Sequence, residues 1–225
     1  MTAGSVRGFI FDMDGLLVDT EPGYLESMQL AAHEQGHKLG SEFMLDLVGR
    51  GGDKSYALIR SQLGTGFDMQ AFGQRWPDIW RDNTTRLGID TKPCVPQLLD
   101  WIHELGLPLT IATSTHAEHA ARTLELSGLK HHFDAIVTGD QVVNGKPAPD
   151  IYLRAASLLG LEPELCLAFE DSVPGVTAAS SAGIRVVMVP DLKSATPHAE
   201  SLAHSVCASL CDSFTLIEQL TAGSR

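Results

Sequence analysis

Five short apolar runs, separated by helical stretches, constrain the fold of this chain more than any other feature of its sequence. The runs are VRGFIFD (6–12), LPLTIATS (107–114), FDAIVT (133–138), LCLAFE (165–170) and IRVVMV (184–189). Each continues into a polar or Gly/Pro-marked turn and then into a helical segment. Near-continuous hydrophobic strands spaced by helices are typical of a parallel sheet that is covered on both faces. The sequence therefore predicts an α/β, Rossmann-like core.

Residues 21–88 interrupt this alternation. The stretch has apolar residues at helical spacing and no convincing strand. We therefore predict two domains, an α/β core made of 1–20 and 89–225 and an inserted α-helical domain made of 21–88. Ligands of parallel sheets bind beyond the carboxyl ends of the strands. The polar residues that follow the apolar runs are thus the candidate functional residues.

Two carboxylates, Asp12 and Asp14, stand at the end of the first run, in the stretch FDMDG. Carboxylates so close together repel each other and are costly to bury, which leaves three interpretations: a bound cation, chemistry performed by the pair, or an acidic turn. A calcium loop of the EF-hand type does not fit. Such a loop needs Gly at its sixth position and Glu at its twelfth, whereas Gly15 stands fourth and Gly23 stands twelfth.

Hydroxyl groups and a lysine follow later in the chain. Thr113, Ser114 and Thr115 end the second run where a helix begins, and hydroxyls at such a position serve either as helix caps or as anion ligands. Lys146 lies in the loop GKPAPD, where Pro147 restricts its backbone to an extended conformation. A loop lysine is commonly a solvated surface residue, so this residue alone is a weak signal.

Glu170 and Asp171 are adjacent acids at the end of the fourth run. They could cap the helix that begins near Pro174, or they could supply oxygen ligands to a hard cation such as Mg²⁺. The two acid pairs, the hydroxyls and the lysine would converge on one edge of the sheet. Together they suit phosphoryl transfer, in which one carboxylate attacks phosphorus, another handles protons, and the hydroxyl, the lysine and Mg²⁺ stabilise the anionic oxygens.

Charge and composition limit the kinds of molecule that the chain can bind and the cellular compartment in which we expect it. The formal charge of -12 disfavours nucleic acid and anionic membranes, and 44% hydrophobic residues without a long apolar run argue against both disorder and a membrane span. The first residues lack a signal peptide, so we expect a cytoplasmic location. We expect the four cysteines, which form no CxxC motif, to be free buried thiols. No protein partner is evident.

The motifs FDMDG with DTEP, IATST, GKPAPD and FEDSVPGV resemble, in order and spacing, those of the haloacid dehalogenase superfamily. The resemblance runs from Val6 to about Leu220 and points to the β-phosphoglucomutase-like and sugar-phosphate phosphatase branch. It implies an Mg²⁺-dependent enzyme that hydrolyses a small phosphorylated metabolite through an aspartyl phosphate. The helical domain would then be a mobile cap that closes over the site and excludes water.

The resemblance also implies roles for the acidic residues. Asp12 would be the nucleophile, and Asp14 the general acid and base that protonates the leaving oxygen and then activates water. Asp12, Asp171 and the backbone carbonyl of Asp14 would bind Mg²⁺. Glu170 would accept a hydrogen bond from metal-bound water.

The remaining roles concern the phosphoryl group and the substrate. The resemblance implies that Thr113 and the amide of Ser114 bind the transferring phosphoryl group, and that Lys146 neutralises the charge between phosphate and nucleophile. Three residues of the helical domain are possible substrate contacts: Glu21, Tyr24 and Arg50.

The residues at single positions distinguish phosphoester hydrolysis from other activities of the superfamily. Dehalogenases and phosphonatases of the superfamily lack the second aspartate of the first motif, whereas Asp14 is present here. Sugar phosphomutases of the β-phosphoglucomutase type carry a histidine where this chain has Tyr24, and Gly52 lies near where their cap arginine is expected. Both departures favour hydrolysis. A phospho-acceptor signalling module is a further alternative. The acceptor aspartate of such a module follows a middle strand, whereas Asp12 comes at the end of the first predicted strand. A catalytically silent binding protein is disfavoured because every reacting position is present.

Overall fold

The computed structural model describes residues 5–48 and 52–222, which belong to two compact units. One unit comprises Met1–Val18 and Asp90–Arg225 and is called here the sheet unit; the other comprises Asp19–Ile89 and is called the helical unit. Each unit has its own elements and its own hydrophobic core.

The sheet unit is built on six parallel strands, as the apolar runs predict. The strand order is β3-β2-β1-β4-β5-β6. The strands are β1 (Gly8–Phe11), β2 (Leu109–Ala112), β3 (Ile136–Val137), β4 (Cys166–Glu170), β5 (Arg185–Met188) and β6 (Ser205–Val206). The α/β prediction is confirmed, and only β6 was not predicted, because two residues are too few to form an apolar run. Phe11 pairs with both Ile111 and Phe169, so the carboxyl ends of the three central strands are level.

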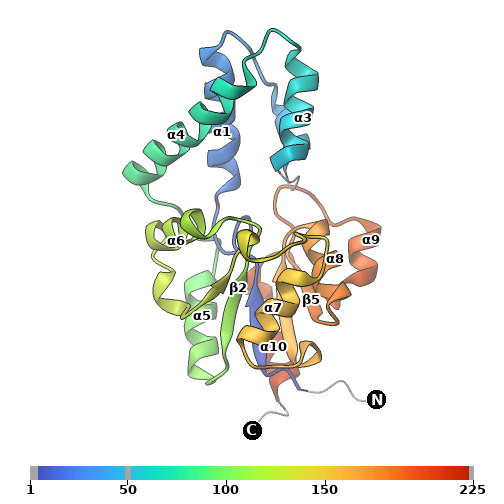
Figure 1. The fold of residues 1–225 in the computed structure, drawn as a ribbon. Helices are drawn as coiled ribbons and strands as arrows, with labels where there is room; N and C mark the ends of the chain where they lie inside the picture. The colour runs from blue at the N-terminus through green and yellow to red at the C-terminus, as the bar shows by residue number, and fades with distance from the viewer. Residues whose placement is uncertain (1–4, 49–51, 223–225) are drawn as a thin grey trace. The chain divides into compact units, whose positions relative to one another are not determined.

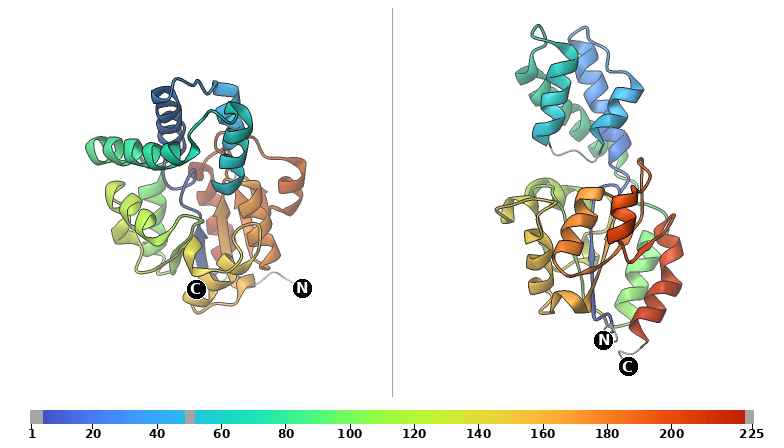
Figure 2. Two further views of the ribbon diagram at one scale, coloured as in Figure 1. Left: turned by 45° about the horizontal axis from the view of Figure 1, so that its top comes forward. Right: turned by 90° about the vertical axis from the view of Figure 1, so that its right-hand side faces the viewer.

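Helices cover both faces of the sheet because alternate side chains of each strand point to opposite faces. Figure 2 shows α7 (Asp150–Leu158) and α8 (Val173–Ser181) on one face, and α5 (Val95–Glu104) and α10 (Phe214–Thr221) on the other. Ile10 of β1 and Ala168 of β4 pack with Tyr152 of α7 on the first face. On the other face the rings of Phe11 and Phe169 stack with centroids 5.1 Å apart. The remaining helices of this unit are α6 (Ala117–Leu126), α9 (Pro197–Leu202), and the short η1 (Lys130–His132), η2 (Gly139–Gln141), η3 (Pro163–Leu165) and η4 (Leu210–Ser213).

The described residues of the helical unit, 19–48 and 52–89, form four helices in the stretches where helical spacing was found. They are α1 (Glu21–Glu34), α2 (Ser41–Leu47), α3 (Gly52–Leu63) and α4 (Met69–Leu87). α1 and α4 lie side by side (Figure 1). The buried side chains Ala31, Leu39, Ile59 and Phe72 belong to one apolar cluster that holds the unit together. Asp68 caps α4 by accepting hydrogen bonds from the backbone N–H groups of its first turn.

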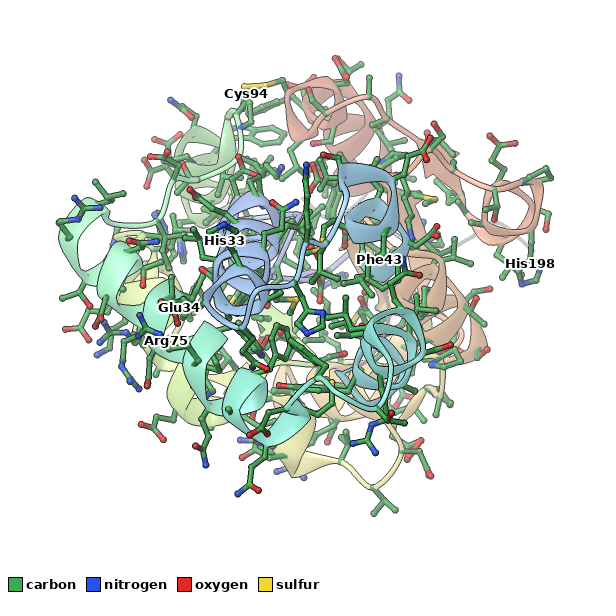
Figure 3. The ribbon with its side chains drawn as sticks, turned by 90° about the horizontal axis from the view of Figure 1, so that it is seen from above. His33, Glu34, Phe43, Arg75, Cys94 and His198 are labelled. Atoms are coloured by element: carbon green, nitrogen blue, oxygen red, sulfur yellow. A yellow bond between two sulfur atoms is a disulfide. The ribbon has the colours of Figure 1, made fainter. Side chains whose placement is uncertain are left out.

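The expectation that all four cysteines are free thiols is wrong. Cys94, at the start of α5, forms a disulfide with Cys211 of η4, and Figure 3 shows the bond at Cys94. The two are 117 residues apart, so no local spacing reveals the pair, which arises because η4 packs against α5. Cys166 and Cys207 are free and buried. No helix within 5–48 and 52–222 is long and apolar enough to cross a membrane, and the cytoplasmic location stays a prediction.

Candidate active site

Asp12 and Lys146 form a buried ion pair at the carboxyl edge of the sheet. Lys146 Nζ lies 2.5 Å from Asp12 Oδ1, and it also donates to Glu170 Oε1 at 2.6 Å and to the carbonyl oxygen of Ala112 at 2.9 Å. These three acceptors match the three N–H donors of an ammonium group. The side chain of Lys146 is only 6% exposed. Lys146 is therefore not a solvated surface lysine.

Glu170, the last residue of β4, is fully buried and holds several groups of the site in place. Its Oε1 accepts from Lys146 and, at 2.7 Å, from the hydroxyl of Tyr152. Its Oε2 accepts from the hydroxyl of Ser172 at 3.0 Å and from the Ser172 backbone N–H at 3.3 Å. A side chain at Gly175, in the first turn of α8, would overlap this carboxylate. Glu170 thus uses its acceptor sites on the chain itself.

Asp12, Glu170 and Asp171 bring one carboxylate oxygen each to within 4.8 Å of one another. Burial raises the pKa of Asp12 to about 7, although Lys146 counteracts this rise. Burial also raises the pKa of Asp171 well above its usual range, and the charges of Asp12 and Glu170 add to this rise. One lysine cannot neutralise three carboxylates, and a donor set made of carboxylate oxygens fits a hard divalent cation.

The loop after β2 lies next to this acidic group. Thr113 is buried, and its hydroxyl accepts a hydrogen bond from the backbone N–H of Thr115 at 3.1 Å. The hydroxyl of Thr115 donates to Asp14 Oδ2 at 2.7 Å. None of the three hydroxyls caps α6, because the carboxylate of Asp140 accepts from the backbone N–H of its first residue, Ala117. The interpretation of these hydroxyls as helix caps is thus not supported.

The structure places the predicted site residues in three groups. Asp12, Lys146, Glu170 and Asp171 are in contact or close together, and they form what we call the carboxylate–lysine cluster. Thr113, Ser114 and Asp14 lie in loops that continue from β1 and β2, and Ser114 is exposed there. Glu21 and Tyr24 belong to α1 of the helical unit. Arg50 lies outside the described residues.

Tyr24 packs inside the helical unit. Its ring stacks on Trp80 with centroids 4.9 Å apart and meets Trp76 edge-on at 5.9 Å. Trp80 is buried, and Trp76 is partly buried against the core of the unit. These contacts give the aromatic residues a packing role in this unit.

Sequence reasoning missed two residues that bind Glu170 and one ion pair after β5. Tyr152 and Ser172 complete the hydrogen bonds of Glu170, and Lys92 pairs with Asp191 at 2.6 Å. Asp191 comes just after the fifth apolar run, much as Asp14 comes just after the first, so the same pattern could have identified it. Tyr152 stands six residues after Lys146, in the first turn of α7, and no sequence spacing assigns it to Glu170.

Comparisons with known proteins agree with this geometry. Residues 6–183 match the haloacid dehalogenase-like hydrolase family. A phosphorylated carbohydrates phosphatase of Thermotoga maritima is 35% identical over 80% of this chain and 82% of its own length. The mitochondrial (DL)-glycerol-3-phosphatase 1 of Arabidopsis thaliana is 34% identical, with 93% of this chain and 72% of that protein covered. The structure of a hydrolase from Deinococcus radiodurans with bound phosphate and sodium superposes with a TM-score of 0.80 at 25% identity, covering 96% and 97% of the two chains.

Proposed function

The chain belongs to the haloacid dehalogenase-like hydrolase family, and from that premise we propose that it is an Mg²⁺-dependent phosphatase of small phosphomonoesters such as sugar phosphates. The observation that carries this proposal is the carboxylate–lysine cluster at the carboxyl edge of the sheet. The phosphatase names of the relatives from Thermotoga maritima and Arabidopsis thaliana support the same reaction class.

In the proposed reaction, a carboxylate oxygen of Asp12 attacks phosphorus and forms an aspartyl phosphate while the bond to the leaving oxygen breaks. Asp14 gives its proton to that oxygen, and the alcohol departs. Asp14 then takes a proton from water, which attacks the aspartyl phosphate, releases inorganic phosphate and restores Asp12. The hydrogen bond from Thr115 orients the carboxylate of Asp14 for both proton transfers.

The other residues of the site stabilise charge. Lys146 already contacts Asp12 and is placed to neutralise an incoming phosphate oxygen next to it. Thr113 and the backbone N–H of Ser114 bind further phosphoryl oxygens. Glu170 positions Lys146 and, because the chain already uses its acceptor sites, would support the metal centre through Lys146 rather than as a direct ligand. Glu21, Tyr24 and Arg50 remain proposed substrate contacts.

Asp12, Asp171 and the backbone carbonyl of Asp14 would hold the metal ion. When bound, the ion supplies positive charge that reduces the repulsion between the anionic substrate and the nucleophile. Mg²⁺ is proposed because it takes one or two carboxylates together with substrate phosphate oxygens.

The test is the release of inorganic phosphate from p-nitrophenyl phosphate and from a panel of sugar, polyol and nucleoside monophosphates. We expect turnover that requires Mg²⁺, stops with EDTA and returns when Mg²⁺ is added back. Mass spectrometry of acid-quenched, working enzyme should find phosphate on Asp12. Phosphate on another side chain, or no phosphate release from any substrate, would contradict the proposal. Conversion of a sugar 1-phosphate to its 6-phosphate without phosphate release would indicate a mutase instead.

A further inference from the structure

Asp191 has one carboxylate oxygen for which the described chain supplies no hydrogen-bond donor. Lys92 Nζ lies 2.6 Å from Oδ1, and the two side chains are 19% and 14% exposed. The other oxygen, Oδ2, is buried and has no hydrogen-bond partner among the described residues. A buried carboxylate oxygen without a donor is unfavourable, and such groups in proteins are commonly satisfied by an ion or by water.

The position of this oxygen connects it with the metal centre. Asp191 follows β5, whose Met188 pairs with Glu170 of β4. Between the two loops lies Gly15, with a φ of +81°, at which a Cβ atom would be 2.7 Å from Asp171 Oδ2 and 3.4 Å from Asp191 Oδ2. The two oxygens therefore flank the same point, which the absence of a side chain at Gly15 leaves open.

We propose that Asp191 is a positioning residue of the metal centre, whose Oδ2 accepts a hydrogen bond from the hydration shell of the ion beside Asp171. The inference rests on the proposed function and deepens it. Mg²⁺ and Mn²⁺ keep several waters when proteins bind them, and residues that hold such outer groups strengthen metal binding. Asp191 is outside the group of three carboxylates whose oxygens lie within 4.8 Å of one another, so a role through water suits it better than direct ligation.

Lys92 fixes Asp191 for this task. Its backbone N–H donates to the carbonyl oxygen of Leu17, which anchors the lysine next to the loop that carries Gly15. The ammonium group donates to Oδ1, so that Oδ2 is the oxygen presented to the site.

The test is a titration of Mn²⁺ into the substrate-free full chain, with free Mn²⁺ measured by electron paramagnetic resonance. Asp191→Leu should weaken Mn²⁺ binding by about ten-fold or more, the loss typical of groups that support metal ligands indirectly. Asp134→Asn is the matched control, because Asp134 is exposed and precedes β3 at the opposite edge of the sheet. It should bind Mn²⁺ as the wild type does.

A double variant, Lys92→Met with Asp191→Leu, separates the carboxylate from the charge of the lysine. The double variant removes both charges of the pair, so no unpaired Lys92 is left to repel the ion. If the single variant does not fold, Mn²⁺ binding can be measured on the double variant instead. We expect the same loss of Mn²⁺ affinity in both. Wild-type affinity in either variant would overturn the inference. Asp171→Asn should lose Mn²⁺ binding. If Asp171→Asn binds Mn²⁺ normally, the proposed metal centre itself is wrong. If Asp171→Asn loses Mn²⁺ binding but Asp191→Leu does not, only the inference about Asp191 is overturned.

Discussion

Charged residues have opposite environments in the two units of the molecule. In the sheet unit, Lys146 is buried and contacts two buried carboxylates, Asp12 at 2.5 Å and Glu170 at 2.6 Å. In the helical unit, Arg75 and Glu34 form a comparably short pair at 2.7 Å, but their side chains are 46% and 47% exposed. Figure 3 shows the Arg75 and Glu34 side chains next to each other on neighbouring helices. The pairs have similar lengths but differ sharply in burial.

This difference indicates which unit performs the chemistry. Buried charges are costly unless they are paired, so a chain that buries Asp12 and Glu170 around one lysine, with Asp171 close by, gains something other than stability. An exposed pair carries no such cost and contributes little, since water and salt screen it. The comparison predicts that substitutions in the carboxylate–lysine cluster alter catalysis strongly and that those at the exposed pair do not.

The largest expected effect belongs to Asp12→Asn. The amide cannot attack phosphorus, so we expect turnover of p-nitrophenyl phosphate with saturating Mg²⁺ to fall by about 10⁴-fold or more. Circular dichroism should show an intact fold, because removing one of three neighbouring carboxylates relieves repulsion. Asp134→Asn, with the same change of charge at the opposite edge, should keep wild-type turnover. Wild-type turnover in Asp12→Asn would remove the basis for assigning the chemistry to this unit.

Lys146→Met should affect both turnover and stability. Without the ammonium group, Asp12 and Glu170 remain buried beside each other with no positive partner. Breaking a buried pair from one side costs about 3–5 kcal/mol, which urea unfolding of the metal-free protein would measure. Turnover should fall by about 10² to 10³-fold, since one charge that stabilises the transition state is lost. Lys130→Met is the control, because Lys130 is exposed. Equal stability of the two variants would show that the cluster does not depend on its lysine.

The contrast between the units also explains what could be predicted from the sequence. The strands and the acids that follow them could be predicted, because a buried parallel strand requires an apolar run and its carboxyl end binds ligands. The contact of Tyr152 with Glu170 could not, since Tyr152 reaches it only through the packing of α7 against the sheet, whereas Ser172 stands just two residues after Glu170. The Cys94–Cys211 disulfide escaped prediction for the same reason. Such contacts arise between elements far apart in the chain, where no local pattern marks them.

The pH dependence of stability should distinguish the buried cluster from the rest of the chain. Burial raises the pKa of Asp12 from 3.8 to about 7 in the metal-free fold. A raised value means that the proton is held more tightly in the folded state, so this stabilising contribution is complete below pH 4 and is lost as the pH rises through about 7. A divalent cation competes with that proton. We therefore expect Mg²⁺ to raise the melting temperature more at pH 8 than at pH 5.5.

Asp12→Asn serves as the control for this prediction, because it removes the titrating group. In EDTA its melting temperature should decline less than that of the wild type between pH 5.5 and pH 8. A parallel decline in both proteins would mean that other groups determine the pH dependence, and the role of the Asp12 proton would be contradicted.

The smallest effect is expected for Arg75→Met in the helical unit. Arg75 donates two hydrogen bonds to Glu34, at 2.7 and 2.8 Å, and these raise the pKa of Arg75 and lower that of Glu34. Because solvent surrounds both side chains, the pair should add little to stability, and that little should disappear in about 1 M salt. Melting temperatures at low and high salt would measure it.

Arg81→Met provides a matched control on the same helix, since Arg81 pairs with Asp78 at similar exposure. We expect both variants to keep the wild-type kcat and KM. An increase in KM for Arg75→Met alone would show that this arginine meets the substrate. The helical unit would then contribute charge to binding, and burial would no longer separate the catalytic charges of this chain from its surface charges.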